Sequence, residues 1–289
     1  MLDCLCSHFS AISREQWLDR MARGRVLDGQ RQPIAPEHRY RVGLTVHYFR
    51  EVADEPTIPF VETILHMDEH LVVVDKPHFL PVLPSGRFVR ETLLWRLIER
   101  LGNPELSPVH RIDRATAGLV MFTTKQSGRD HYQALFRERR IEKRYEALAR
   151  AAPAMTFPCV RKSRIKRGDP FFRASEMPGP TNAYTHIEVL SRSSHLADHW
   201  HYSLRPTTGR THQLRIHLAA LGAPIANDRL YPTLLPEQAD DYNAPLQLLA
   251  KELAFIDPHT GTRRTFTSSL TLVNETDISK HKDSAVAPT

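Results

Sequence analysis

Hydrophobic positions along the chain follow two spacings, one typical of helices and one typical of strands. In residues 90–101 apolar side chains recur every three or four positions, which predicts an amphipathic helix. Similar patterns predict helices at about 14–24, 126–137 and 211–221, and short apolar runs predict strands at 62–66, 70–75, 119–124, 145–148, 184–190, 201–205 and 246–256. Because these elements mix without a strict strand–helix–strand rhythm, we expect an α+β fold with a mixed, largely antiparallel sheet flanked by helices.

The same pattern divides the chain into parts. Residues 1–52 form a small unit, in which a capping-box pattern at 13–16 opens the helix, 25–30 resembles a hairpin turn, and 41–48 is a closing strand. Residues 53–59 contain two prolines and acidic side chains, as linkers do. We expect the main body at 60–275 and a flexible, polar tail at 276–289.

Composition adds a basic charge to this picture. The chain has 289 residues, and 39 Lys and Arg against 33 Asp and Glu give a formal net charge of +6. A basic balance favours a polyanionic partner. Residues 161–167 concentrate five cations in seven positions. This run is either an ordinary solvated face or a surface that follows phosphates, and the pattern leaves both readings open.

Several classes of protein are excluded. No apolar run approaches the length of a bilayer span and no secretory signal is evident, so we expect no membrane contact. Cys4, Cys6 and Cys159 offer no second pair for a zinc site, so we expect free thiols in the cytoplasm. Motifs for nucleotides, nucleophile elbows and metalloproteases are absent, which predicts an enzyme without a metal or redox cofactor. The histidines within 195–201 are a weak alternative metal site.

One carboxylate lies among cations in a segment rich in turn-forming residues. Asp113 stands between Arg111 and Arg114, just before the predicted strand at 119–124. Nearby cations favour the ionised carboxylate. A surface ion pair has the same pattern, so this segment alone does not identify a catalytic group.

A second segment, 205–218, predicts a tight turn that leads into a helix. The free N–H groups at such a helix N-terminus attract anions. Leu214 and Leu218 share the face expected to be buried, whereas Arg215 lies beside that stripe and can extend toward a site.

These segments together resemble the RluA-type pseudouridine synthases. The similarity covers roughly residues 60–258 and consists of five motifs in the family's order: the strand pair 62–77 ending in Asp-Lys-Pro, the H-R-I-D-R-A-T-A-G segment 110–118, E-K-R-Y at 142–145, the R-P-T-T-G-R-T-H-Q-L-R-I-H-L segment 205–218, and L-L-A-K-E-L-A-F at 248–255. The resemblance implies the pseudouridine synthase fold and an RNA uridine isomerase without a cofactor or metal. It also implies ribosomal or transfer RNA as partner and a monomeric state.

The resemblance also implies a role for each matched residue. Asp113 would be the catalytic aspartate, attacking either the base or the ribose. Tyr145 would lie against the uracil and take part in moving the C5 proton. Arg215 would pair with Asp113, and Arg111 would fill the space left by the flipped nucleotide. The residues expected to bind RNA are Arg111, Arg114, Arg161, Lys162, Arg164, Lys166, Arg167, Arg210 and His212.

The chain departs from the family pattern in a few places. The N-terminal unit resembles a degenerate S4-like RNA-binding module, or is a mere structural extension. Phe79, Leu249 and Asp257 stand where the family usually has Gly, His and His, which affects substrate choice more than chemistry. Two other functions stay open: a non-catalytic RNA-binding protein or chaperone on this fold, and a hydrolase of N-glycosidic bonds that would release free uracil.

Overall fold

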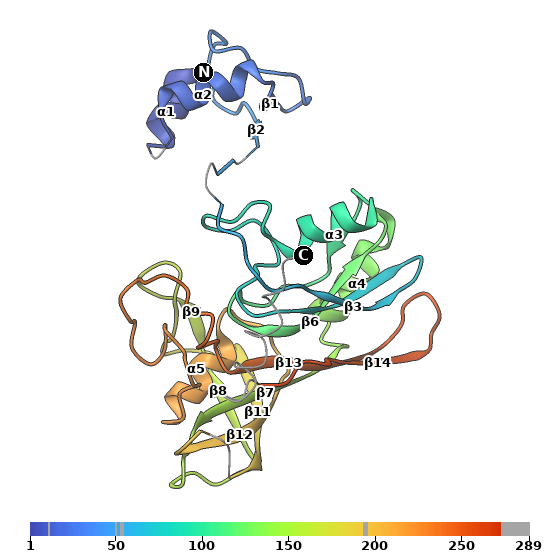
Figure 1. Cartoon of the computed structure of the whole chain (residues 1–289), viewed down its shortest axis with the longest axis vertical. Coiled ribbons are helices and arrows are strands. Elements are labelled where there is room, and N and C mark those ends of the chain that lie inside the picture. The colour runs from blue at the N-terminus through green and yellow to red at the C-terminus, as the bar shows by residue number, and fades with distance from the viewer. Residues whose placement is uncertain (11, 50, 53–54, 193–195, 273–289) are drawn as a thin grey trace, which may run out of the picture. The chain divides into compact units, whose positions relative to one another are not determined.

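The computed structural model describes residues 1–10, 12–49, 51–52, 55–192 and 196–272 (Figure 1). It divides the chain into two compact units, Met1–Asp54 and Glu55–Thr289. The second unit therefore includes residues 55–59, which the sequence places in a linker. The carboxylate of Glu55 accepts hydrogen bonds from the backbone N–H groups of Val89, Arg90 and Glu91, so it anchors this segment within the second unit.

The first unit has a hydrophobic core of its own. It contains the helices α1 (Leu2–His8) and α2 (Arg14–Ala22) and the short paired strands β1 (Val26–Asp28) and β2 (Val46–Tyr48). The capping box at α2 is present, because Ser13 and Gln16 each accept a hydrogen bond from the other's backbone N–H. Trp17 is fully buried at the centre of this core. Helix α1 was not predicted, and the closing strand is shorter than the predicted 41–48.

The described part of the second unit contains a ten-stranded sheet in the order β3-β4-β6-β13-β7-β12-β11-β8, with β5 and β14 on its branches. All pairs are antiparallel except β6 with β13, which confirms the predicted mixed, largely antiparallel sheet. The strands are β3 (Thr63–Met67), β4 (Leu71–Lys76), β5 (Ser107–Pro108), β6 (Ala117–Thr123), β7 (Glu142–Arg150), β8 (Cys159–Ser163), β11 (Ala183–Ser191), β12 (His199–Pro206), β13 (Leu248–Ile256) and β14 (Arg263–Thr267).

Helices cover both faces of this sheet. Helix α3 (Leu93–Leu101) packs on one face of β4 and β6, and α4 (Arg129–Arg137), which follows the 3-10 turn η1 (Gln126–Gly128), packs on the other. Helix α5 (Gln213–Ala220) packs on β7, β11 and β12. Tyr145 of β7 contacts both the α3 core and the α5 core, so these two helices flank the middle of one sheet face.

The basic run at 161–167 forms strands that the sequence did not predict. Its residues belong to the edge strand β8 and to β9 (Ile165–Arg167), which pairs with β10 (Ala174–Glu176) in a separate two-stranded hairpin. Apolar periodicity predicts strands, and cations at most of these positions conceal it.

Gly118 has a backbone reason to be glycine. Its φ is +107°, and a Cβ at this position would lie 2.3 Å from the carbonyl oxygen of Ala250. The close approach occurs in the parallel pairing of β6 with β13. The glycine that ends the 110–118 segment therefore lets the two central strands meet directly behind the Asp113 loop.

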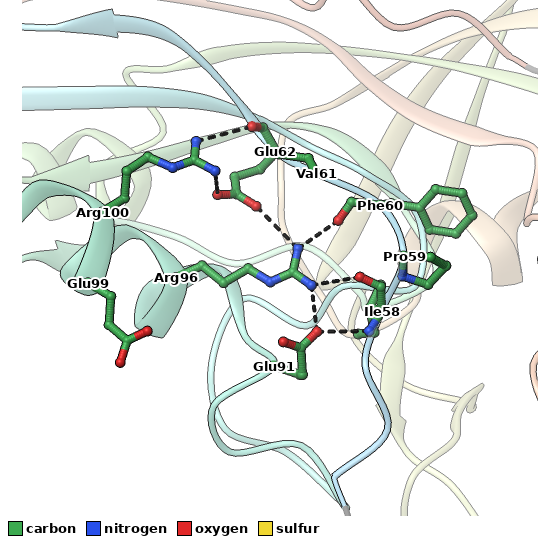
Figure 2. Close-up of a pocket in the computed structure, with 9 residues that line it drawn as sticks. All are labelled: Ile58, Pro59, Phe60, Val61, Glu62, Glu91, Arg96, Glu99 and Arg100. Carbon is green, nitrogen blue, oxygen red and sulfur yellow. Dashed lines mark hydrogen bonds and ion pairs between the residues drawn. The ribbon is translucent and has the colours of Figure 1, made fainter. Parts of the chain in front are cut away.

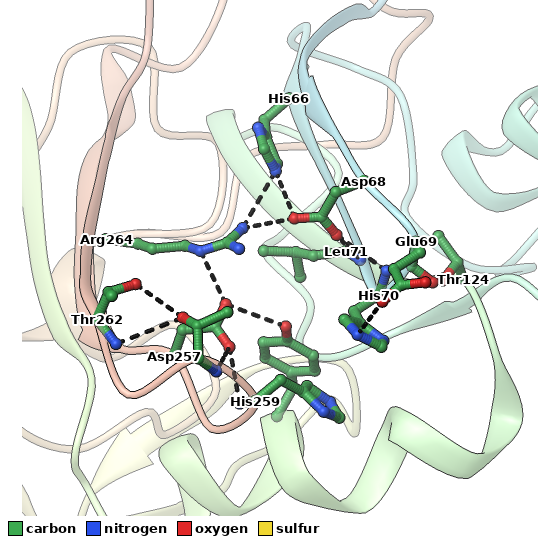
Figure 3. Close-up of polar contacts among 12 residues, drawn as sticks. His66, Asp68, Glu69, His70, Leu71, Thr124, Asp257, His259, Thr262 and Arg264 are labelled. Carbon is green, nitrogen blue, oxygen red and sulfur yellow. Dashed lines mark hydrogen bonds and ion pairs between the residues drawn. The ribbon is translucent and has the colours of Figure 1, made fainter.

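A polar cluster ties the ends of two hairpins together (Figure 3). The guanidinium of Arg264 in β14 contacts Asp68 at 2.6 Å and Asp257 at 2.8 Å. Burial opposes ionisation of Asp68, but hydrogen bonds from Arg264 and His66 hold its pKa well below its ordinary value. Asp257 is buried and also accepts a hydrogen bond from the Tyr132 hydroxyl. Asp257, at one of the positions that depart from the family pattern, therefore belongs to the polar cluster at this hairpin end.

Candidate active site

The loop that carries Asp113 joins β5 to β6 and is held at several points. His110 accepts a hydrogen bond from the backbone N–H of Met121 and its ring stacks on Phe136 at 4.5 Å. The carbonyl of Asp113 accepts a hydrogen bond from the N–H of Thr116, which closes a turn. The side chain of Asp113 is 31% exposed, so the carboxylate stays reachable from solvent while its backbone is fixed.

Arg215 lies on α5 with a side chain only 5% exposed. Its Nη1 lies 3.4 Å from Oδ2 of Asp113, the partner that the family resemblance implies for Arg215. Its stronger partner is Asp228, which accepts hydrogen bonds from Nε at 2.8 Å and Nη2 at 2.6 Å. This fork-shaped pairing fixes the plane of the guanidinium, so that its remaining edge faces Asp113. Sequence reasoning missed Asp228, because a single Asp in an irregular segment gives no signal of its own.

Tyr145 lies on β7 between β12 and β13, where it pairs with Leu204 and Ala250. Burial and the charge of Asp113 raise the pKa of its hydroxyl above the ordinary value, which favours the neutral phenol. Asp113, Tyr145 and Arg215 therefore come from three distant segments, and the charge of Asp113 acts on both of the others.

Lys76 and His78 contact the backbone of the loop that carries Asp113. Lys76 ends β4 with no exposed surface, and its Nζ donates to the carbonyls of Pro77 and Arg114. Burial holds the pKa of Lys76 well below its ordinary value, against the opposing charge of Asp113. His78 places its Nδ1 2.7 Å from the carbonyl oxygen of Ala115. Lys76 is the lysine of the Asp-Lys-Pro motif and His78 directly follows that motif, but the sequence analysis assigned neither residue a role.

The E-K-R-Y motif at 142–145 contacts the turn in the segment 205–218. Lys143 donates from its Nζ to the carbonyl of Thr208 at 3.0 Å, and burial lowers the pKa of Lys143 to about 8. The amide oxygen of Gln213 accepts hydrogen bonds from the Thr208 hydroxyl and the Arg210 N–H. These contacts hold the turn at the start of α5, and this turn sets the direction of the helix that carries Arg215.

The residues predicted to bind RNA have different surroundings. Arg111, Lys162, Lys166, Arg167 and Arg210 are exposed, whereas Arg161 and Arg164 are partly buried against Glu176 and the carbonyl of Pro178. Arg114 forms a two-point pair with Asp240. The side chain of His212 is only 11% exposed and faces Asp113 and Tyr231.

Phe79, which replaces the family's usual glycine, adopts a φ of +66°. This conformation strains any residue with a side chain. Its buried ring packs 6.0 Å from Phe60 and 5.1 Å from Tyr242, which offsets that cost. The backbone shape associated with glycine is thus kept, and an aromatic cluster is added beside the Asp113 loop.

One hollow in the described part of the second unit is not lined by Asp113, Tyr145 or Arg215. A cavity of about 430 Å³ lies between residues 58–62 and α3, where Arg96 binds Glu62 and Glu91 (Figure 2). Within the described ranges no group of His, Cys, Asp or Glu has an arrangement suited to a metal ion, and His195 of the weak alternative site lies outside those ranges. No described helix combines the length and apolar character needed to cross a membrane.

The lowered pKa of His78 predicts that the folding stability is sensitive to acid. Burial lowers the pKa of His78 to about 4, from an ordinary value of 6.5. Below about pH 6.5 the unfolded chain therefore binds a proton that the folded chain does not, and acid favours unfolding until the folded pKa is reached. His78→Asn, whose amide can still donate to Ala115, should flatten the pH dependence of unfolding by up to about 1.4 kcal/mol per pH unit near pH 5.

The check is urea unfolding of both proteins from about pH 8 to about pH 5. Between about pH 8 and pH 7 the difference between variant and wild type should stay constant, because His78 is neutral in both states there. Parallel curves at lower pH would contradict the prediction.

The chain is similar to known proteins over most of its length. Residues 70–220 match the family described as RNA pseudouridylate synthase. An uncharacterised RNA pseudouridine synthase of Synechocystis sp. is 34% identical over 80% of this chain and 79% of its own. The dual-specificity RNA pseudouridine synthase RluA of Pasteurella multocida is 33% identical over 71% of this chain and 91% of its own.

Solved structures share the fold. Human RNA pseudouridylate synthase domain containing 4 aligns with a TM-score of 0.57 at 25% identity, covering 76% of this chain and 92% of that one. Human RNA pseudouridylate synthase domain containing 1 aligns with a TM-score of 0.60 at 22% identity, covering 81% and 98%. The predicted pseudouridine synthase fold is confirmed. The chain belongs to the RNA pseudouridylate synthase family, in its RluA type, and is an isomerase that acts on uridine in RNA.

Proposed function

We propose that this enzyme converts uridines of ribosomal or transfer RNA to pseudouridine with Asp113 as its catalytic residue. The observation that carries the assignment is the contact between Arg215 Nη1 and Asp113 Oδ2 at 3.4 Å, across 102 positions of sequence. The charge of Asp113 also acts on the hydroxyl of Tyr145, which lies on the sheet face between α3 and α5. A reachable carboxylate, a buried guanidinium and a neutral phenol together supply charge, orientation and a proton-bearing group.

The reaction exchanges one bond of the ribose for another. The bond from C1′ to N1 breaks, a bond from C1′ to C5 forms, C5 loses its proton and N1 gains one. Asp113 attacks either the base or C1′ of the ribose, and the bond that it forms breaks again before the product leaves, which restores the carboxylate. Tyr145, kept neutral by burial, can accept the C5 proton only as its own proton leaves. The target nucleotide must first leave the stack, since C1′ and C5 cannot both be reached inside it.

RNA contact is proposed along the exposed cations. Arg111 beside Asp113 fills the space of the flipped nucleotide, and the β9–β10 hairpin carries Lys166 and Arg167. The loop of this hairpin exposes Phe171 by 70% and Phe172 by 47%, which provides faces for unstacked bases. This combination favours a phosphate-tracking surface over an ordinary solvated face.

Three further features are part of the proposal. The first unit, with its helix α2 followed by β1, would act as an S4-like RNA-binding module. The enzyme would work as a monomer, and in the cytoplasm, where its three free cysteines stay reduced. The choice between RNA classes rests on relatives: one is named a dual-specificity enzyme, and a Saccharomyces cerevisiae protein 27% identical to this chain is named a tRNA pseudouridine(31) synthase.

The test is a modification assay on unmodified ribosomal and transfer RNA transcripts. The protein, with no cofactor added, should create discrete pseudouridines that carbodiimide mapping detects, and should release no uracil. Free uracil would identify a hydrolase of the N-glycosidic bond. Tight RNA binding without any new pseudouridine in either RNA class would support the binding-protein alternative.

A further inference from the structure

A chain of polar contacts leads away from the Asp113 carboxylate. Nε2 of His212 lies 3.8 Å from Oδ2 of Asp113, and Nδ1 of the same ring lies 2.9 Å from the hydroxyl of Tyr231. That hydroxyl lies 2.8 Å from the backbone nitrogen and 2.9 Å from the backbone oxygen of Ala174 in β10. The contacts therefore run from Asp113 to the basic hairpin through two side chains.

The surroundings of His212 fit a positioning role better than a contact with phosphate. Its side chain is 11% exposed, and Tyr231 is 6% exposed. Its backbone has a φ of +55° at the N-cap of α5, yet its side chain makes no capping hydrogen bond there. Such strain in a residue with a side chain is costly and concentrates at functional sites. The backbone conformation thus directs the imidazole toward Asp113 and Tyr231.

The arrangement also selects one form of the ring. A carboxylate beside Nε2 favours a proton on that nitrogen, which leaves Nδ1 to accept a hydrogen bond. The Tyr231 hydroxyl has a single proton and two acceptors at 2.9 Å, Nδ1 of His212 and the carbonyl oxygen of Ala174. When the ring proton is on Nε2, the hydroxyl donates to Nδ1 in place of that carbonyl, while the Ala174 N–H donates to the hydroxyl oxygen. Burial lowers the pKa of His212 and so keeps the ring neutral. With Tyr231 in place, the N–H edge of His212 faces the carboxylate.

We propose that Tyr231 and His212 are positioning residues, which hold the Asp113 carboxylate and link its orientation to the backbone of the β9–β10 hairpin. The expected effect on the rate of isomerisation rests on the proposed function. The contact geometry itself does not depend on that function. RNA that engages the hairpin would thereby steady the carboxylate through Ala174, Tyr231 and His212.

The experiment compares Tyr231→Phe with wild type in two measurements. Nitrogen-15 NMR of histidine-labelled protein without RNA, with the His212 signal assigned from a His212→Gln variant, reads the ring tautomer. Single-turnover assays on an RNA substrate read rate and affinity separately. We expect the Nε2–H form to lose its dominance in Tyr231→Phe. The rate should fall by about 10-fold to 100-fold, the range for losing an orienting group, with RNA affinity within about two-fold.

Tyr202→Phe is the matched control. Tyr202 is fully buried, and its hydroxyl donates to the backbone oxygen of Arg150, away from the site. Tyr202→Phe should lose about as much folding stability as Tyr231→Phe, while its isomerisation rate and its His212 NMR signal should match those of wild type. A double variant with His212→Gln should be no slower than the slower single variant.

An unchanged tautomer in Tyr231→Phe, or a rate within about two-fold of wild type, overturns the proposal, as does an equal loss of rate in Tyr202→Phe. If wild type itself makes no pseudouridine, the proposed function fails, while the NMR result still decides whether Tyr231 orients His212.

Discussion

Replacing Asp113 with asparagine is expected to reduce pseudouridine formation by at least about 10³-fold, as removal of a central catalytic group does in other enzymes. The amide keeps the shape of the side chain but loses the charge and the nucleophilic oxygen. RNA affinity should change little, because the exposed cations of the hairpin and of Arg111 remain. The measurement is a single-turnover rate on the RNA substrate found by modification mapping.

The fold should survive this change, and the structure gives the reason. Arg215 is held chiefly by Asp228, at 2.6 and 2.8 Å, and only secondarily by Asp113 at 3.4 Å. Its buried charge therefore stays compensated, and the stability should change by no more than about 1 kcal/mol. Asp130→Asn serves as the control, since Asp130 is an exposed α4 residue paired with Arg137. Residual activity of Asp113→Asn near that of this control would refute the catalytic assignment.

The regular elements could be predicted from sequence because their signals are local. Helix α3 follows from apolar spacing, and α2 begins at a capping box that the structure contains. The strands of the basic run and helix α1 could not be predicted in this way. Tertiary pairing with β11 and β10 makes β8 and β9 extended, whatever their charges. Helix α1 has seven residues, too few for periodicity to show.

The candidate site was predictable only as far as its motifs extend. Asp113, Tyr145 and Arg215 were identified by their order along the chain, and the structure brings Arg215 to Asp113. Asp228, which pairs with Arg215, and Tyr231, which contacts His212, lie in a segment where the structure has neither helix nor strand. Local pattern gives no hint that such residues are buried, because burial there depends on packing against α5 and β10.

Substitution of Asp228 by asparagine is expected to cost about 3 kcal/mol of folding stability and more than about 100-fold in rate. Asp228 is 1% exposed and is the two-point partner of a guanidinium that is itself 5% exposed. Without its charge, Arg215 is buried beside only the longer contact to Asp113, and a buried uncompensated charge is strongly destabilising. Arg215 would also lose the contact that sets its plane, so its edge would no longer face Asp113.

Urea unfolding and single-turnover kinetics measure the two effects. Asp240→Asn is the matched control, because Asp240 also forms a two-point pair with an arginine, Arg114, whose side chain is 35% exposed. Solvent screens that pair, so its loss should cost about 1 kcal/mol or less. Equal losses of stability in the two variants would mean that burial of the Asp228–Arg215 pair is not what matters. A stable Asp228→Asn with full activity would mean that Arg215 is oriented by its helix alone.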